Sequence, residues 1–242
     1  MKKLMWMLAM LLPLAVQANE DVHLDKAPIN PANQASLQRG AKVFVNYCLN
    51  CHGAAAMRYN RLKDIGLTEE QIKSNLLFAG EKVGETMQVS VKPLEAKAWF
   101  GATPPDLSVI ARSRTPDWLY TYLRGFYRDE SRPTGWNNVA FPNVGMPHVL
   151  WQLQGDQQLK VEEGKDADGN KTETHHLVLV KPGTLSPAEY DAMVADLVNY
   201  LAYMSEPAKA KRLHLGVAVL AFLAFFFLLA LALKKEFWKD IH

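Results

Sequence analysis

From Leu215 to Leu233 the chain runs for 19 residues without a charged side chain. As a helix this segment measures about 29 Å at ~1.5 Å per residue, which matches the hydrocarbon thickness of a bilayer. Phenylalanine and leucine residues occupy every face of that helix, so it lacks the polar side of a surface helix in a soluble protein. The pattern predicts a membrane-spanning helix over residues 213–233, and the alternative is a helix buried in a protein core.

The N-terminus carries a different hydrophobic segment. Lys2 and Lys3 precede an apolar run from Leu4 to Val16, and Val16-Gln17-Ala18 has small residues at the expected cleavage positions. This run is shorter than the ~20 residues that a spanning helix needs, so residues 1–18 are predicted to be a secretory signal peptide rather than an uncleaved anchor. Export then places residues 19–211 outside the cytoplasmic membrane and leaves residues 234–242 inside. The basic residues that flank the apolar helix are equal in number on the two sides, so they do not decide the orientation.

The composition fits a globular exported region. Hydrophobic residues make up 49% of the chain and charged residues 21%, enough to bury a core in one main domain. The chain has 27 basic and 25 acidic residues, so the two numbers are equal once Lys2 and Lys3 are left out. A chain with no net charge after removal of the signal peptide argues against nucleic acid as a partner.

Two amphipathic helices are predicted in the exported region. Residues 34–47 place apolar side chains on one side, and residues 187–206 follow a capping box formed by Ser186 and Glu189, with a proline at the first helical position. Gly40 and Phe44 lie four residues apart on the first helix, which suggests a close crossing with the second helix near Tyr200. Ordinary helix packing is the alternative.

Between these helices the chain is rich in proline, which indicates short helices joined by ordered loops. One helix is predicted from Pro116 to about Phe126 because proline favours the first helical position. The turn signal Asp168-Gly169-Asn170 lies between the segments Leu159-Lys160-Val161 and Leu177-Val178-Leu179-Val180. This arrangement predicts a small, peripheral β-hairpin.

Cys48-Leu49-Asn50-Cys51-His52 is the attachment pattern of c-type haem. Its spacing lets two thiols reach the two vinyl groups of one porphyrin, while the next residue presents an imidazole to the iron. A zinc site would need further paired ligands, for which His175-His176 is the candidate. A thioredoxin-like dithiol would need a βαβ context and would leave His52 unexplained. The pattern therefore predicts one haem c, bound covalently through Cys48 and Cys51 and ligated by His52.

The sixth ligand of the iron has to come from a distant part of the chain. Met146 lies in the segment Phe141-Pro142-Asn143-Val144-Gly145-Met146-Pro147, where glycine permits a close backbone approach and two prolines stiffen the loop. This loop favours Met146, and Met87, His148 or an open coordination site remain as alternatives. Arg112 and Arg114 follow an apolar run, and one of them can pair with a haem propionate, although a solvated surface role is equally compatible with the pattern.

The chain resembles the cytochrome c1 family from about Asp25 to its C-terminus. The residues that carry the resemblance lie on both sides of the haem motif: Leu37-Gln38-Arg39-Gly40, Tyr59, Leu62, Gly101-Ala102-Thr103-Pro104-Pro105-Asp106-Leu107-Ser108 and Gly145-Met146-Pro147. The resemblance implies that Met146 is the axial ligand, that Arg114 meets a haem propionate, and that Pro105 and Tyr120 line the haem pocket. It also implies a mainly α, c-type cytochrome fold with long loop insertions, the peripheral hairpin and one C-terminal transmembrane helix.

This resemblance implies an electron-transfer subunit of a quinol:cytochrome c reductase, the bc1 complex. The haem then accepts one electron from the Rieske iron-sulfur protein and passes it to a soluble cytochrome c, with cytochrome b and membrane lipid beside the anchor. The expected location is a bacterial inner membrane with the haem domain on the periplasmic side, and no independent catalysis is expected from the isolated chain. The alternatives are a free-standing, membrane-anchored cytochrome that feeds a terminal oxidase, and a haem enzyme such as a peroxidase, which requires an open iron site.

Overall fold

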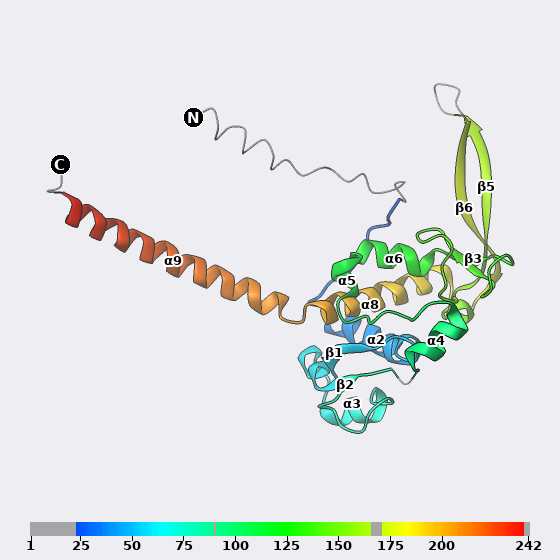
Figure 1. Ribbon diagram of the computed structural model, residues 1–242, viewed down its shortest axis with the longest axis horizontal. Helices are drawn as coiled ribbons and strands as arrows, with labels where there is room; N and C mark the ends of the chain where they lie inside the picture. Colours follow the sequence, from blue (N-terminus) through cyan, green and yellow to red (C-terminus); the bar gives the residue numbers. More distant parts are fainter. Residues whose placement is uncertain (1–22, 90, 166–170, 240–242) are drawn as a thin grey trace.

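The computed structural model describes residues 23–89, 91–165 and 171–239, and Figure 1 shows their arrangement. Within these residues, a mainly helical domain carries three two-stranded antiparallel sheets, and one long helix leaves it at the C-terminal end. The predicted mainly α fold with a peripheral hairpin and a C-terminal apolar helix is confirmed. The predicted signal peptide, residues 1–18, lies outside the described residues.

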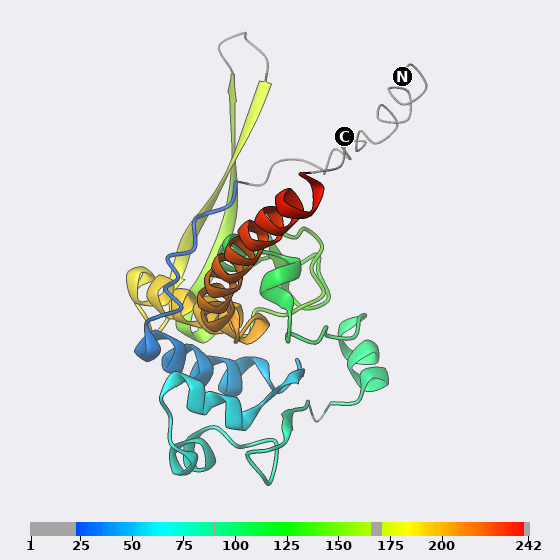
Figure 2. The ribbon, with the colours of Figure 1, turned by 90° about the vertical axis from the view of Figure 1, so that its left-hand side faces the viewer.

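Helices α2 (Gln34–Val43) and α8 (Pro187–Ser205) form the centre of the domain and lie side by side in Figures 1 and 2. The capping box predicted at Ser186 is present, with the hydroxyl and the Glu189 carboxylate each satisfying a backbone N–H at the start of α8. The predicted crossing at Gly40 is also present. A Cβ atom built on Gly40 would lie 2.1 Å from the Asp196 carbonyl oxygen, so the two backbones touch at this glycine.

The chain leaves α2 through a single π-helical turn, η1 (Phe44–Cys48). It continues through β1 (Ala54–Arg58), the 3-10 helix η2 (Tyr59–Ile65) and α3 (Glu69–Asn75) to β2 (Thr86–Met87), which pairs with β1. The π turn and the following turn place the haem motif at the C-terminal end of α2. The haem motif is therefore anchored to the core of the domain, because α2 packs against α8.

The middle of the chain contains short helices joined by loops, as its prolines predict. These are α4 (Pro93–Phe100), α5 (Ile110–Ser113) and α6 (Pro116–Arg124), followed by the paired strands β3 (Phe126–Arg128) and β4 (Trp136–Asn138). Helix α6 starts at the predicted proline and packs against α8. Fully buried side chains of the domain core include Phe44, Tyr59, Leu62, Ile72, Met87, Phe126, Tyr190, Leu197 and Tyr200.

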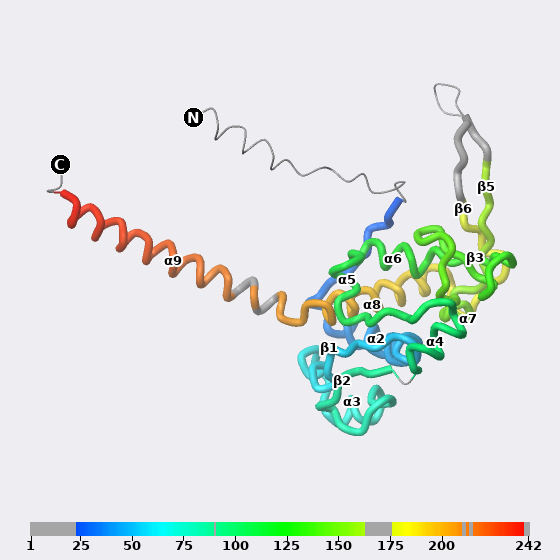
Figure 3. Tube along the Cα trace, viewed as in Figure 1, coloured from blue at the N-terminus to red at the C-terminus, as the bar shows by residue number. Residues whose placement is uncertain are grey.

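After the single-turn helix α7 (Trp151–Gln154), the predicted hairpin is confirmed as β5 (Gly155–Lys165) paired with β6 (Lys171–Pro182). It projects from the domain as an isolated ribbon (Figures 1 and 3). Both strands extend beyond the predicted segments 159–161 and 177–180, because polar residues on either side also pair between the strands. The predicted turn at Asp168-Gly169-Asn170 lies outside the described residues.

The last element is α9 (Lys209–Trp238). Its segment from Leu215 to Trp238 has a mean hydropathy of 2.8, and none of the 18-residue window that defines it is buried against the domain. Figure 1 shows the helix extending away from the rest of the chain. The predicted helix is therefore present, starts four residues earlier than expected, and has the length and apolar surface that a membrane span requires.

Candidate cofactor site

A cavity of about 350 Å³ brings together residues that are far apart in the sequence. Cys48, Cys51 and His52 line it from the end of α2, and Met146 lines it from the loop before α7. Most of the remaining wall is apolar and comes from the end of α4, from α5 and the loop before it, from α6, from the loop before α7 and from α8: Phe100, Pro104, Pro105, Leu107, Ile110, Trp118, Leu119, Tyr122, Leu123, Val144, Leu197 and Leu201.

The haem motif forms a tight turn at the edge of this cavity. The backbone N–H groups of Cys51 and His52 both donate to the Cys48 carbonyl oxygen, at 3.1 and 2.8 Å. This turn places both free thiols and the imidazole on one cavity. Burial raises the pKa of the Cys48 thiol to about 12, so the free side chain is a neutral thiol rather than a thiolate.

The orientation of His52 is set by a backbone carbonyl. Its Nδ1 lies 2.8 Å from the Pro105 carbonyl oxygen, which can only accept a hydrogen bond. Nδ1 therefore carries the proton, and the lone pair is on Nε2, the nitrogen available to a metal. Burial also lowers the pKa of His52, which favours the neutral imidazole. Pro105 thus lines the cavity, as the resemblance implies, and acts on His52 through its backbone.

Asp106 fastens the Pro105 loop to the haem motif. One carboxylate oxygen accepts from the backbone N–H of Ala55 at 2.8 Å and the other from that of Ser108, also at 2.8 Å. The backbone N–H of Leu107 donates to the Gly53 carbonyl oxygen at 2.8 Å. The sequence predicted no role for Asp106, which lies within the family-like stretch 101–108. Its role depends on two segments about 50 residues apart, which only the fold brings into contact.

The loop that carries Met146 is held at several points. Asn143 has a left-handed backbone with φ of 63°, and its N–H donates to the Asn137 side-chain oxygen at 2.8 Å. Arg132 donates to the Asn143 side-chain oxygen at 3.1 Å and to its carbonyl oxygen at 3.0 Å. Asn138 accepts from the N–H groups at the start of the same loop and donates to the Tyr122 carbonyl oxygen at 2.8 Å. This polar network was not predicted from the sequence, where the pair Asn137-Asn138 is its one visible sign.

The alternative iron ligands lie elsewhere. Met87 is fully buried in β2, where the Tyr200 hydroxyl donates to its sulfur at 3.8 Å, and it does not line the cavity. His148 is 2% exposed and stacks on Phe126 with the ring centroids 4.7 Å apart. Burial lowers its pKa to about 4. Among the methionines that the structure describes, Met146 is the one that lines the cavity with His52.

The zinc alternative requires a cluster of ligands. Within residues 23–89, 91–165 and 171–239, no group of three or more His, Cys, Asp or Glu side chains is placed so that it could hold a metal ion. A zinc site built on His175-His176 therefore has no cluster among these residues to support it.

Arg114 supplies the cationic group of the cavity. It directly precedes α6, and its guanidinium carbon lies 5.1 Å from the centroid of the Trp118 ring and 5.9 Å from that of Phe141. The side chain is exposed, so it stands at the mouth of the cavity rather than inside it. Arg112, the other candidate, lines a different cavity.

The structure does not place Tyr120 in this cavity. Trp118 and Tyr122 line it, whereas Tyr120 lies on another face of α6, with its ring centroid 4.5 Å from the Arg124 guanidinium. The reason is helical periodicity, because residues four apart share a face and a shift of two residues moves a side chain to the far side. The tyrosine on the cavity side is Tyr122, which the sequence analysis did not select.

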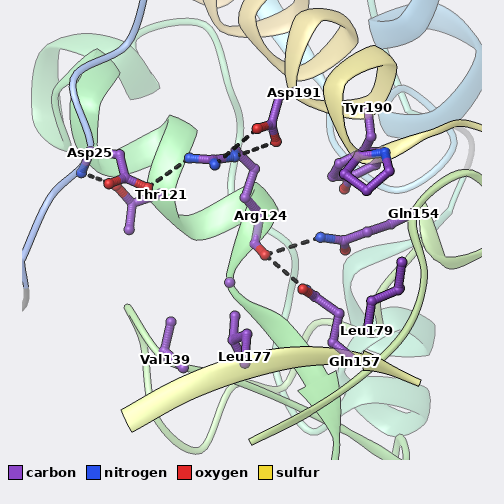
Figure 4. A pocket seen from close by; sticks show the side chains of 12 residues that line it. Asp25, Thr121, Arg124, Val139, Gln154, Gln157, Leu177, Leu179, Tyr190 and Asp191 are labelled. Atoms are coloured by element: carbon purple, nitrogen blue, oxygen red, sulfur yellow. Dashed lines mark hydrogen bonds and ion pairs between the residues drawn. The ribbon is translucent and has the colours of Figure 1, made fainter. Parts of the chain in front are cut away.

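A second cavity, of about 310 Å³, lies beside that other face of α6 (Figure 4). Arg124 donates to both carboxylate oxygens of Asp191, at 2.6 and 3.0 Å, and to Asp25 at 2.7 Å. The Arg124 guanidinium thus bridges two carboxylates and ties α8 and the N-terminal segment to α6. The ion pairs beside the second cavity therefore help to hold α6, the helix that forms a wall of the first cavity.

The first cavity fits a c-type haem. Two thiols and a neutral imidazole meet on one turn, a thioether comes from a separate loop, the walls are apolar, and one guanidinium stands at the mouth. An apolar porphyrin with two carboxylates and two axial iron ligands needs this set of groups. Burial also raises the pKa of the Tyr122 hydroxyl, so that group remains a hydrogen-bond donor in the wall.

Comparisons with known proteins give a consistent result. Residues 25–241 match the Cytochrome C1 family. The chain is 51% identical to cytochrome c1 of Allochromatium vinosum over 221 residues, which cover 91% of this chain and 90% of that protein. It is 52% identical to a protein named ammonia monooxygenase gamma subunit from Nitrosomonas europaea, over 95% of this chain and 93% of that protein. It is 29% identical to cytochrome c1 of Rhodospirillum rubrum, over 86% of this chain and 83% of that protein.

Proposed function

Because the chain belongs to the cytochrome c1 family, we propose that it transfers electrons through one covalent haem c as a subunit of a quinol:cytochrome c oxidoreductase, the bc1 complex. The observation that carries this proposal is the cavity shared by Cys48, Cys51, His52 and Met146. When bound, the haem iron alternates between ferrous and ferric and so carries one electron. The free-standing cytochrome is not favoured by the relatives, and no independent catalysis is proposed for the isolated chain.

The residues of the cavity divide this task among them. Cys48 and Cys51 would hold the haem covalently, which would prevent its loss, and His52 and Met146 would ligate its iron. Two protein ligands would leave no site for an external substrate on the iron, which suits electron transfer and disfavours peroxidase chemistry. Arg114 pairs with a propionate at the mouth of the cavity, where its charge remains solvated. The apolar walls exclude water from the iron.

We place the protein in a bacterial inner membrane by the following division of the chain. Residues 1–18 direct export, residues 19–211 form the haem domain on the periplasmic side, residues 213–233 span the bilayer, and residues 234–242 remain in the cytoplasm. The unburied apolar surface of α9 supports the span. Cytochrome b and lipid then contact this helix, the Rieske protein delivers the electron, and a soluble cytochrome c receives it.

Purification of the full-length chain in mild detergent tests the proposed complex. Co-elution with a b-type haem protein and an iron-sulfur protein is expected, together with quinol:cytochrome c reductase activity. Deletion of the gene is expected to abolish that activity in the membranes. A solitary cytochrome from a strain that keeps its full quinol-oxidising activity without the gene would instead establish the free-standing alternative.

Covalent attachment has a direct test. Cys51→Ala is expected to weaken or abolish the haem stain after denaturing electrophoresis, because one of two thioether bonds is lost. Asn50→Ala is the matched control, since Asn50 is exposed between the two cysteines and does not line the cavity. Equal staining of the two variants would contradict the assignment, as would a wild-type chain that holds zinc and no haem.

A further inference from the structure

Tyr122 stands in the cavity wall with its hydroxyl 3.3 Å from the sulfur of Met146. The residue is 9% exposed, and its ring is fixed by aromatic neighbours on the same face of α6 and in β3. The Trp118 ring stacks on it with a centroid distance of 4.8 Å and an interplanar angle of 11°, and the Phe126 ring meets it edge-on at 5.1 Å. The phenol is therefore held in one orientation, directed at Met146.

The same tyrosine is tied to the loop that carries Met146. The Asn138 side chain donates to the Tyr122 carbonyl oxygen at 2.8 Å and accepts from the N–H of Ala140 at 2.9 Å. Asn138 is fully buried, so these bonds are shielded from water. The Tyr122 hydroxyl and the Met146 sulfur are thus held near each other by hydrogen bonds that link α6 to the Met146 loop.

We propose that Tyr122 is a positioning residue for electron transfer, whose hydroxyl donates a hydrogen bond to the Met146 sulfur and thereby raises the reduction potential of the haem. The proposal rests on the proposed function, in which Met146 is the axial ligand. It goes beyond the ligand assignment, because it names the group that tunes the ligand.

The physical reason is electrostatic. The positive end of the O–H dipole points at the sulfur and withdraws electron density from it, so the thioether stabilises a ferric iron less well than it otherwise would. Oxidation adds a positive charge to the iron, and a donor fixed nearby in an apolar wall disfavours that charge. Hydrogen bonds around an axial ligand are one of the means by which a protein sets a haem potential. The ferrous state is favoured, and the potential rises.

The chain offers a matched control for this contact. Tyr200 also directs its hydroxyl at a methionine sulfur, that of Met87, at 3.8 Å. Both residues are completely buried, and neither lines the cavity. Removal of the Tyr200 hydroxyl therefore reports what the loss of a buried O–H···S contact does to the fold alone.

The test is a potentiometric titration of the full-length holoprotein in mild detergent. Tyr122→Phe is expected to lower the reduction potential while carbon monoxide still fails to bind the ferrous haem, because Met146 remains the ligand. Tyr200→Phe is expected to leave the potential unchanged, whatever its effect on stability. An unchanged potential in Tyr122→Phe, or equal shifts in both variants, would overturn the proposal.

A second variant keeps the test decisive even if Tyr122→Phe yields no holoprotein. Site-specific 3-fluorotyrosine at position 122 retains the ring and the hydroxyl but is a stronger hydrogen-bond donor, so the potential is expected to rise. A fall or no change would overturn the proposal.

The two hypotheses are separated in a Met146→Leu background. If Met146 is the ligand and Tyr122 acts through it, Tyr122→Phe produces no further shift there. A persistent shift would overturn the role of Tyr122 and leave the ligand assignment intact. If Met146→Leu itself leaves the potential and carbon monoxide binding of the wild type unchanged, the ligand assignment fails, and the proposed role of Tyr122 fails with it.

Discussion

Met146→Leu is expected to open the sixth coordination position of the haem iron. Carbon monoxide should then bind the ferrous haem, which it does not do when both axial positions are filled. The reduction potential should fall by a substantial part of the ~0.8 V range over which axial ligands set haem potentials, because a thioether favours ferrous iron. Leucine has nearly the volume of methionine, so the loop and the covalently bound haem should be retained.

Met87→Leu is the control for this result. Met87 is as deeply buried as any residue of the core, yet it lies in β2, outside the cavity. Its substitution should leave the potential and the carbon monoxide binding of the wild type. If Met87→Leu opens the iron and Met146→Leu does not, the assignment of the sixth ligand is wrong.

Gly40→Ala is expected to be among the most destabilising single changes in the haem domain. The new Cβ would lie 2.1 Å from the Asp196 carbonyl oxygen and 2.7 Å from its carbonyl carbon, and both are backbone atoms of α8 that no side-chain rotation can move. Alanine gains about 1 kcal/mol of helix propensity over glycine, whereas forcing two packed helices apart costs about 1–3 kcal/mol or more. At this severity of overlap the packing cost dominates.

Thermal unfolding of the holoprotein, followed by circular dichroism, measures the effect. A domain of this size loses roughly 2–4 °C in melting temperature for each kcal/mol, so a fall of several degrees is expected. Gly84→Ala is the control, because a Cβ built on Gly84 meets nothing within 4 Å. Equal melting temperatures for the two variants would mean that α2 and α8 do not cross at Gly40 as closely as described.

Local features of the chain were predictable because their causes are local. The capping box at Ser186 and the proline at the start of α6 act within one helical turn, so the start of each helix follows from a few residues. The uncharged run within α9 predicts a membrane environment, because a helix with no polar face is not suited to water. The haem motif belongs with these features, because its two thiols and imidazole share one turn of backbone.

The haem pocket beyond that turn was only partly predictable. The glycine and prolines around Met146 indicated a stiff loop and so favoured Met146, which is the methionine that the structure places in the cavity. The face of α6 that lines the cavity was not predictable in this way: Tyr120 lies against Arg124, and Tyr122 directs its hydroxyl at Met146. Tyr120 follows Leu119 and Tyr122 precedes Leu123, so each tyrosine has one apolar neighbour in the chain and the local sequence does not distinguish them. The rotation of α6 is decided by its packing against α8.

The amino-acid sequence alone therefore determined the cofactor class, the membrane anchor, the two central helices and the peripheral hairpin, because each depends on residues close together in the chain. Tertiary structure alone decided which groups contact His52 and Met146 and where the two central helices cross. Pro105 reaches His52 across 53 positions, Tyr122 reaches Met146 across 24, and Gly40 meets a helix more than 150 residues away. Such contacts follow from how helices rotate and cross once their apolar faces are buried together, and no local spacing encodes that geometry.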